Sequence, residues 1–201
     1  MLEVARWVAL GYAIASRLGY VCYVGLALRR EEQSRSFTRQ DGPAAGFQRF
    51  RRIASRIMTN DGVAFVAACV AGWDTLPDLG IPRIVLAAAG VVLVALGVGT
   101  KLWARATLGA EAYYWVNFFT DAPEVIPART GPYRFLENPM YTVGYAHTYG
   151  LALVTASVPG LIAALFDQVA ILAFHRLVEK PHFDRNRAVR AGPALSDDRH
   201  T

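Results

Sequence analysis

The sequence predicts an all-α membrane protein, a polytopic bundle of about five transmembrane helices that ends in a helical hairpin. Apolar residues make up 54% of the 201 residues, and the mean hydropathy of +0.26 exceeds that of typical soluble domains. Several apolar runs approach the roughly 20 residues that cross a bilayer. Basic residues gather in alternate connections. We expect residues 1–187 to form one membrane-embedded domain and the polar tail 188–201 to be disordered.

The expected spans are residues 4–28, 62–73, 81–103, 141–156 and 161–178. The first run is followed by Arg29-Arg30 and lacks a small-residue cleavage site, so we read it as a retained span. The second is short, and both a full and a re-entrant crossing remain open. The turn SVPG at 157–160 separates the last two spans and makes them a hairpin.

Charge sets the expected orientation. Lysines and arginines cluster in 29–60, in 101–140 and after 178, whereas 74–80 and 157–160 carry none. The positive-inside rule therefore places the three basic regions in the cytoplasm. The net charge of +5 then reflects topology rather than nucleic-acid binding. The absence of a targeting peptide favours a bacterial inner membrane.

The segment FQRFRRIASRIM at 47–58 places Phe47, Phe50, Ile53 and Ile57 at helical spacing, with arginines on the other side. This pattern is typical of an interfacial helix on anionic lipid. A stop-transfer flank that only sets topology explains it equally well.

Two ionisable residues, Arg17 and Asp167, fall near the middle of the first and last spans. A lone charge at that depth costs roughly 2.5–3.5 kcal/mol, so such residues usually face inward and pair. We predict that Arg17 and Asp167 approach each other and fix the packing of these two helices. Near the last span, His175, Glu179 and His182 match no strong ligand spacing, so we expect no metal site.

Two motifs stand at the same expected membrane face. The stretch GPYRFLENPMYTVGY at 131–145 is a polar turn that runs into an apolar helix. The stretch ALGVGTK at 95–101 holds the pair Gly97 and Gly99, but it lacks the strand that a dinucleotide fold needs. Close helix packing and backbone contact with a ligand both remain open for this pair.

Taken in order, the glycine pair, LGAEAYYWVNFF, the polar turn and a hairpin ending in VEKPHF resemble the phospholipid N-methyltransferase family, whose relatives include the isoprenylcysteine carboxyl methyltransferases. The resemblance covers roughly 90–187, the expected cofactor-binding core. It implies that Gly97, Gly99 and Glu179 bind S-adenosylmethionine. The run Glu137-Asn138-Pro139 stands where the carboxyl methyltransferases usually have Arg-His-Pro, which favours the phospholipid branch.

The remaining cofactor roles follow from chemistry. Arg134 or Lys180 is expected to pair with the cofactor's carboxylate. The polar turn is expected to cradle the cofactor, with Tyr141 facing the adenine or the sulfonium because aromatic faces favour cations. The residues of the turn assigned to this site are Asn138, Pro139, Met140 and Tyr141.

The expected substrate is a phospholipid from the bilayer, phosphatidylethanolamine or its mono- and dimethyl derivatives. Its ammonium must lose a proton, and Glu111 and His147 are the candidates for the base or proton path. Glu111 is equally well a solvated charge paired with Arg105, and His147 a hydrogen-bonded bundle residue. Tyr114 is expected to contact the headgroup and Trp115 to lie in an interfacial belt.

Other functions remain open at this point. A membrane methyltransferase that acts on a thiol or a prenylcysteine carboxylate would keep the cofactor and change the acceptor. A nicotinamide-dependent membrane reductase would change the cofactor, and a non-catalytic membrane module would need neither.

Overall fold

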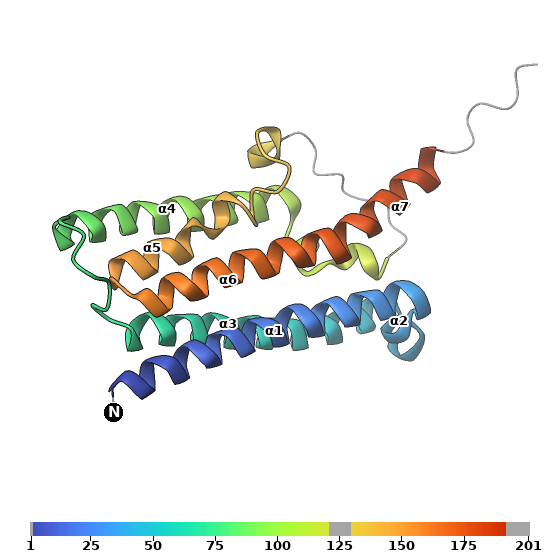
Figure 1. Ribbon diagram of the computed structural model, residues 1–201. Coiled ribbons are helices and arrows are strands. Elements are labelled where there is room, and N and C mark those ends of the chain that lie inside the picture. Colours follow the sequence, from blue (N-terminus) through green and yellow to red (C-terminus); the bar gives the residue numbers. More distant parts are fainter. Residues whose placement is uncertain (1, 121–129, 192–201) are drawn as a thin grey trace, which may run out of the picture.

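The computed structural model describes residues 2–120 and 130–191, and in these ranges the chain is all-helical (Figure 1). Four helices are long and apolar enough to cross a membrane. The protein is therefore a polytopic helical membrane protein, as the sequence predicted. The final helix continues to Ala191, so the expected tail is helical for its first four residues, and 192–201 lie outside the described residues.

The first two long helices, α1 (Leu2–Ser34) and α3 (Pro43–Ala71), pack side by side and are joined by the short α2 (Ser36–Asp41). The basic segment 47–58 is not a separate loop helix, because it forms the first half of α3. Phe47, Phe50 and Ala54 are buried, and the same stripe continues through Ala64 and Ala68. A single apolar face thus runs the length of α3, which extends the second span well before residue 62.

The third long helix, α4 (Arg83–Leu108), packs mainly on the nine-residue α5 (Ala146–Val154). Glycines allow this close approach. A Cβ at Gly90 would lie 2.6 Å from the carbonyl oxygen of Gly150, and one at Gly97 would lie 2.3 Å from the backbone nitrogen of His147. The expected fourth span is shorter than predicted, because the turn from Asn138 continues through η4 (Val143–Tyr145) before α5 begins.

The last long helix consists of α6 (Val158–Phe174), the π-helical turn η5 (His175–Glu179) and α7 (Lys180–Ala191) without a break. Ser157 caps its start by accepting a hydrogen bond from the Gly160 amide at 3.0 Å. In Figure 1, α6 runs between the α4–α5 pair and the α1–α3 pair. It therefore contacts both halves of the bundle.

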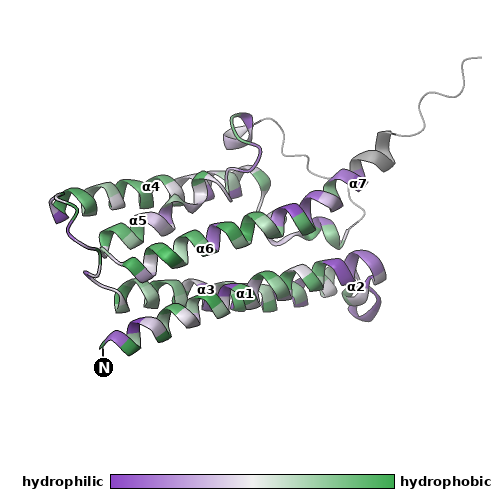
Figure 2. Cartoon of the chain, viewed as in Figure 1, coloured by the Kyte–Doolittle hydropathy of each residue, from purple (hydrophilic) through white to green (hydrophobic). Residues whose placement is uncertain are grey.

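One end of the bundle is more polar than the helices that form its body. Hydrophilic residues gather at this end, around α2 and α7, whereas α4 and α6 are largely hydrophobic along their length (Figure 2). At the opposite end, the connection after α3 is bonded to the connection before α6, through the Asp74 amide to Thr155 and the Leu76 amide to Ala156. Large apolar side chains such as Ile84, Val92 and Leu102 are exposed on α4 and face the lipid.

Candidate active site

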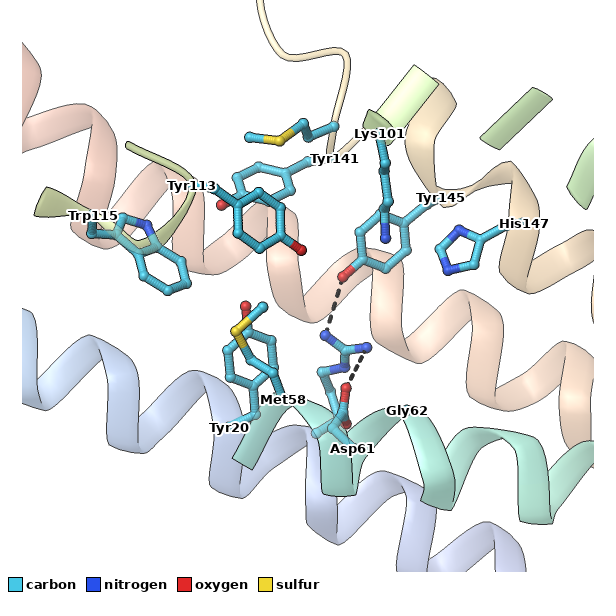
Figure 3. Close-up of a pocket in the computed structure, with 12 residues that line it drawn as sticks. Tyr20, Met58, Asp61, Gly62, Lys101, Tyr113, Trp115, Tyr141, Tyr145 and His147 are labelled. Carbon is cyan, nitrogen blue, oxygen red and sulfur yellow. Dashed lines mark hydrogen bonds and ion pairs between the residues drawn. The ribbon is translucent and has the colours of Figure 1, made fainter. Parts of the chain in front are cut away.

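A cavity of about 220 Å³ lies between α1, α3, α4 and the segment that leads into α5 (Figure 3). We name its two parts by their lining. The charged end is formed by Arg17, Asp61, Lys101, Tyr145 and His147. The aromatic end is formed by Tyr20, Tyr113, Trp115 and Tyr141, with Met58 and Met140.

Arg17 organises the charged end. Its Nη2 lies 2.8 Å from Asp61 Oδ2 and 2.8 Å from Asp167 Oδ2, and its Nη1 donates to the Tyr145 hydroxyl at 3.1 Å. All four side chains are buried. The predicted meeting of Arg17 and Asp167 is confirmed. The sequence does not predict that α3 also joins this ion-pair cluster, through Asp61. Asp61 lies just before the expected span 62–73 and is therefore not predicted to be a charge inside the bundle.

Lys101 and His147 complete the charged end. The Lys101 Nζ lies 4.5 Å from the centre of the Tyr145 ring. A Cβ at Gly144 would approach the Lys101 Cγ to 3.0 Å, so the glycine leaves room for the lysine stem. The His147 Nδ1 lies 2.6 Å from the Gly144 carbonyl oxygen, which assigns the proton to Nδ1 and leaves Nε2 as an acceptor in the neutral ring.

Glu179 holds the aromatic end together. Its Oε1 accepts hydrogen bonds from the Trp115 indole and, at 2.7 Å, from the Tyr141 hydroxyl, and its Oε2 lies 2.6 Å from His175 Nδ1. Burial, together with the Glu179 carboxylate, raises the pKa of Tyr141 well above its usual value. The Tyr141 phenol therefore stays protonated and remains a donor. His175 and Glu179 both belong to the π turn η5, a feature frequent at functional sites.

Trp115 reaches Glu179 through an unusual backbone. Its φ of 60° lies in the left-handed region, which costs about 1–3 kcal/mol for a residue other than glycine. This residue separates the two 3₁₀ turns η1 (Ala112–Tyr114) and η2 (Val116–Phe118). With this left-handed backbone between the two turns, the indole lies inside the bundle. Trp115 is therefore buried rather than part of an interfacial belt.

Several residues expected at the site meet at the cavity. Met140, Tyr141 and His147 line it. Asn138 shapes the turn before them, since its Oδ1 accepts from the Tyr141 amide at 3.3 Å, and Pro139 is fully buried beneath it. Together with Glu179, these residues form one contiguous group across the polar turn and η5.

The other expected residues lie away from the cavity. Glu111 is exposed, and Arg105 lies over the Tyr113 ring at 5.7 Å instead of pairing with it. Tyr114 lies beneath the Arg51 guanidinium at 5.1 Å, and the neighbouring Tyr113 lines the cavity in its place. Both tyrosines belong to the 3₁₀ turn η1, in which successive side chains point in different directions because a turn has about three residues.

Both expected partners of a cofactor carboxylate are also directed elsewhere. Arg134 is exposed, with its guanidinium 5.8 Å from the Phe135 ring. Lys180 pairs with Asp184 at 2.8 Å, and both side chains are exposed. The glycine pair is split, because Gly97 is pressed against the His147 backbone while a Cβ at Gly99 would meet nothing within 4 Å. Close helix packing therefore accounts for Gly97, which acts on the site by placing His147.

Comparison with known proteins identifies the family of the chain. Residues 85–186 match the family model described as phospholipid methyltransferase, just over half of the chain. This range contains Lys101, Trp115, Tyr141, His147 and Glu179. No solved structure matches the chain significantly.

Among curated proteins, the chain is similar to several fungal proteins named phosphatidylethanolamine N-methyltransferase. It is 31% identical to the protein of Chaetomium globosum over 179 residues. This alignment covers 86% of this chain and 19% of the relative. It is 34% identical to the protein of Aspergillus clavatus over 137 residues, an alignment that covers 68% of this chain and 14% of that relative. The chain thus spans about a fifth or less of the length of these relatives. On the match over residues 85–186, the chain belongs to the phospholipid methyltransferase family.

Proposed function

We propose that this protein is an S-adenosylmethionine-dependent methyltransferase that adds methyl groups to the amine of phosphatidylethanolamine, of its mono- and dimethyl derivatives, or of both, toward phosphatidylcholine. The observation that carries the proposal is a cavity in which charged and aromatic walls adjoin, formed largely by residues inside the matched family range. A zwitterionic lipid headgroup and a cationic methyl donor both suit such walls.

The aromatic end fits the methyl donor. A sulfonium is a cation, and the faces of Tyr20, Trp115 and Tyr141 favour a cation. The Tyr133 hydroxyl is buried without a hydrogen-bond partner, and burial together with Glu179 raises its pKa, so it is a protonated donor close to that carboxylate. Glu179 Oε2 accepts one bond and has room for another. When bound, the donor supplies an electrophilic methyl group.

The charged end fits the acceptor and the proton that it loses. We assign the proton path to His147, whose Nδ1 is bonded to Gly144 and whose Nε2 is left as an acceptor. His147 lines the cavity beside Lys101, and the tight contact at Gly97 holds its backbone in place. Positioning of the amine and exclusion of water are then the main contributions of the protein.

The proposal includes the orientation of the domain. In this proposal residues 90–187 form the cofactor-binding core of a single domain, 1–187, and the hydrophilic end of the bundle around α2 and α7 lies on the cytoplasmic side, where the active site is proposed to face. The exposed face of α3, with Arg49, Arg52 and Arg56, contacts anionic lipid at that surface. The proposed host is a bacterial inner membrane, although the relatives named above are fungal.

The reaction is tested with the purified protein and methyl-labelled S-adenosylmethionine. Phosphatidylethanolamine, its mono- and dimethyl forms and a prenylcysteine are offered separately. Label in one or more of the phospholipids supports the proposal and shows which methylation steps occur. Label only in the prenylcysteine, or no transfer together with no cofactor binding, contradicts it.

Sidedness is tested separately in oriented membrane vesicles. A cysteine placed at the exposed position 52 of α3 should react with a membrane-impermeant maleimide only from the cytoplasmic side. Reaction only from the opposite side would overturn the orientation without affecting the chemistry.

A further inference from the structure

We propose that Lys101 and Asp61 together form an ionic clamp for the phosphoethanolamine headgroup, with Lys101 binding the phosphodiester and Asp61 the ammonium. The proposal rests on the proposed function, because the lipid concerned is the acceptor of that reaction. It adds a substrate-binding role for two residues on different helices, α4 and α3.

The charges at this end of the cavity balance in number but not in pairing. Arg17 and Lys101 are cations, and Asp61 and Asp167 are carboxylates. Arg17 takes both carboxylates through its Nη2, at 2.8 Å each. Within the described part of the chain, Lys101 has no ion pair. Lys101 is only partly exposed, and a charge within a membrane bundle normally requires a partner, so the lysine is arranged to receive an anion.

Lys101 is held in position by contacts that leave its ammonium available. The stem passes over Gly144, where a Cβ would be 3.0 Å from Cγ and 3.4 Å from Cε. The ammonium then rests on the face of Tyr145, 4.5 Å from the ring centre, and lines the cavity. A cation–π contact orients an ammonium without using its N–H donors in an ion pair, so these donors remain for a phosphate oxygen.

Asp61 is the complementary half of the clamp. It is the only carboxylate among the residues described as lining the cavity. Its Oδ2 lies 2.8 Å from Arg17 Nη2, and within residues 2–120 and 130–191 this is the only ion pair that Asp61 forms. Asp167 shares the same guanidinium nitrogen but does not line the cavity. Asp61 alone can therefore meet a ligand cation.

A zwitterion satisfies both groups at once. A headgroup with a phosphodiester and an ammonium neutralises Lys101 and Asp61 without adding net charge to the bundle. A phosphatidylglycerol headgroup would leave Asp61 facing neutral hydroxyls, and an ethanolamine lipid without phosphate would leave Lys101 unpaired. Leaving a buried charge unpaired is unfavourable, so the clamp predicts selection for the zwitterionic lipid.

The test measures binding to the purified full chain by isothermal titration calorimetry. The probes are short-chain phosphatidylethanolamine, short-chain phosphatidylglycerol and a diacylglycerol ether of ethanolamine that lacks phosphate. Wild type should bind phosphatidylethanolamine roughly tenfold or more tightly than either of the others. Lys101→Met should weaken phosphatidylethanolamine by a similar factor and leave the phosphate-free lipid unchanged, whereas Asp61→Asn should leave phosphatidylglycerol unchanged. Equal weakening of all three lipids would overturn the proposal.

Asp167→Asn is the matched control for folding. Because Asp167 and Asp61 pair with the same Arg17 nitrogen, both substitutions should lower the unfolding temperature. Only Asp61→Asn should weaken phosphatidylethanolamine binding, and Asp167→Asn should stay within about twofold of wild type. Equal losses of binding in the two variants would mean that Asp61 only supports Arg17.

A second titration separates the two oxyanions that Lys101 can meet. S-adenosylhomocysteine carries the same amino-acid carboxylate as the methyl donor, and Lys101→Met should leave its affinity within about twofold. Weaker S-adenosylhomocysteine binding with unchanged lipid binding would assign Lys101 to the donor and contradict the clamp. Failure of the proposed function looks different, because the lipid-binding pattern would then persist without methyl transfer.

Discussion

The two carboxylates of the site, Glu179 and Asp61, are equally buried but are held in opposite ways. Glu179 accepts hydrogen bonds from two uncharged donors, the Trp115 indole and the Tyr141 hydroxyl, and its other oxygen lies 2.6 Å from His175 Nδ1. Asp61 meets one charged group, Arg17, and shares it with Asp167. The first carboxylate fixes the walls of the aromatic end, while the second belongs to a residue that lines the cavity.

The difference shows how one cavity combines rigidity with an open charge. Hydrogen bonds from uncharged groups hold a carboxylate in one place without neutralising it. A guanidinium shared between two carboxylates leaves both of them incompletely paired. The arrangement suits the proposed function, in which one wall is fixed for the cofactor and one group is available for the lipid.

Removing Arg17 is expected to break the charged end most severely. Arg17→Met would leave Asp61 and Asp167 without their common partner, and loss of one member of a buried ion pair destabilises proteins by about 3–5 kcal/mol. Unfolding of the detergent-solubilised protein by denaturant would measure the loss. The triple variant Arg17→Met/Asp61→Asn/Asp167→Asn should recover most of the stability. A loss of stability that persists in the triple variant would contradict this explanation.

Removing Glu179 is expected to have the next largest effect, at the other end. Glu179→Ala would leave the buried Trp115 donor and the partly buried Tyr141 donor unpaired, at about 1–3 kcal/mol each. The affinity of this variant for S-adenosylhomocysteine should fall together with its stability. Glu179→Gln keeps an acceptor for these donors and should preserve more of the stability. Equal losses for alanine and glutamine would show that the negative charge, rather than the acceptor, matters.

The spacing between the two ends is tested at the α4–α5 contact. A Cβ at Gly97 would lie 2.3 Å from the His147 nitrogen, so Gly97→Ala should force α4, which carries Lys101, away from α5. Overpacking of this kind costs about 1–3 kcal/mol. The paired variant Gly99→Ala meets open space and should be neutral or stabilising by up to about 1 kcal/mol. Thermal unfolding and lipid binding of the two variants check the contrast, and equal loss in both would implicate the glycine pair as a unit.

Lys180 lies outside both ends and is expected to matter least. Its ion pair with Asp184 is exposed, 61% for Lys180 and 51% for Asp184, and such pairs contribute about 0–1 kcal/mol. Lys180→Ala should therefore leave stability and S-adenosylhomocysteine affinity nearly unchanged. A tenfold loss of that affinity would return Lys180 to the cofactor site.

Hydropathy and charge were enough to predict the membrane bundle, and the depth of Arg17 and Asp167 was enough to predict their contact. The continuous α3 could not be predicted in the same way. A run of arginines reads as the end of a membrane span, but these arginines lie on the face opposite Phe47 and Phe50, so one helix accommodates both. Because the expected span begins at residue 62, Asp61 falls just outside it and is not predicted to be a buried charge of the bundle.

The site was predicted best where the motif is local. Met140 and Tyr141 in the polar turn and His147 at the start of α5 are close in sequence and meet at the cavity. The inward position of Trp115 depends on one left-handed residue, which neither periodicity nor composition reveals. Lys101 was overlooked because a basic residue at the end of a span usually marks the membrane surface, whereas here it turns into the bundle.

The height of the bundle has a consequence of its own. The 33 residues of α1 extend about 50 Å, whereas the hydrocarbon layer is about 30 Å thick. A tilt of about 20° shortens the projection of this helix only slightly. A substantial part of α1 must therefore lie outside the hydrocarbon layer. The proposed water-soluble methyl donor and the proposed lipid can then approach the same helices from two different solvents.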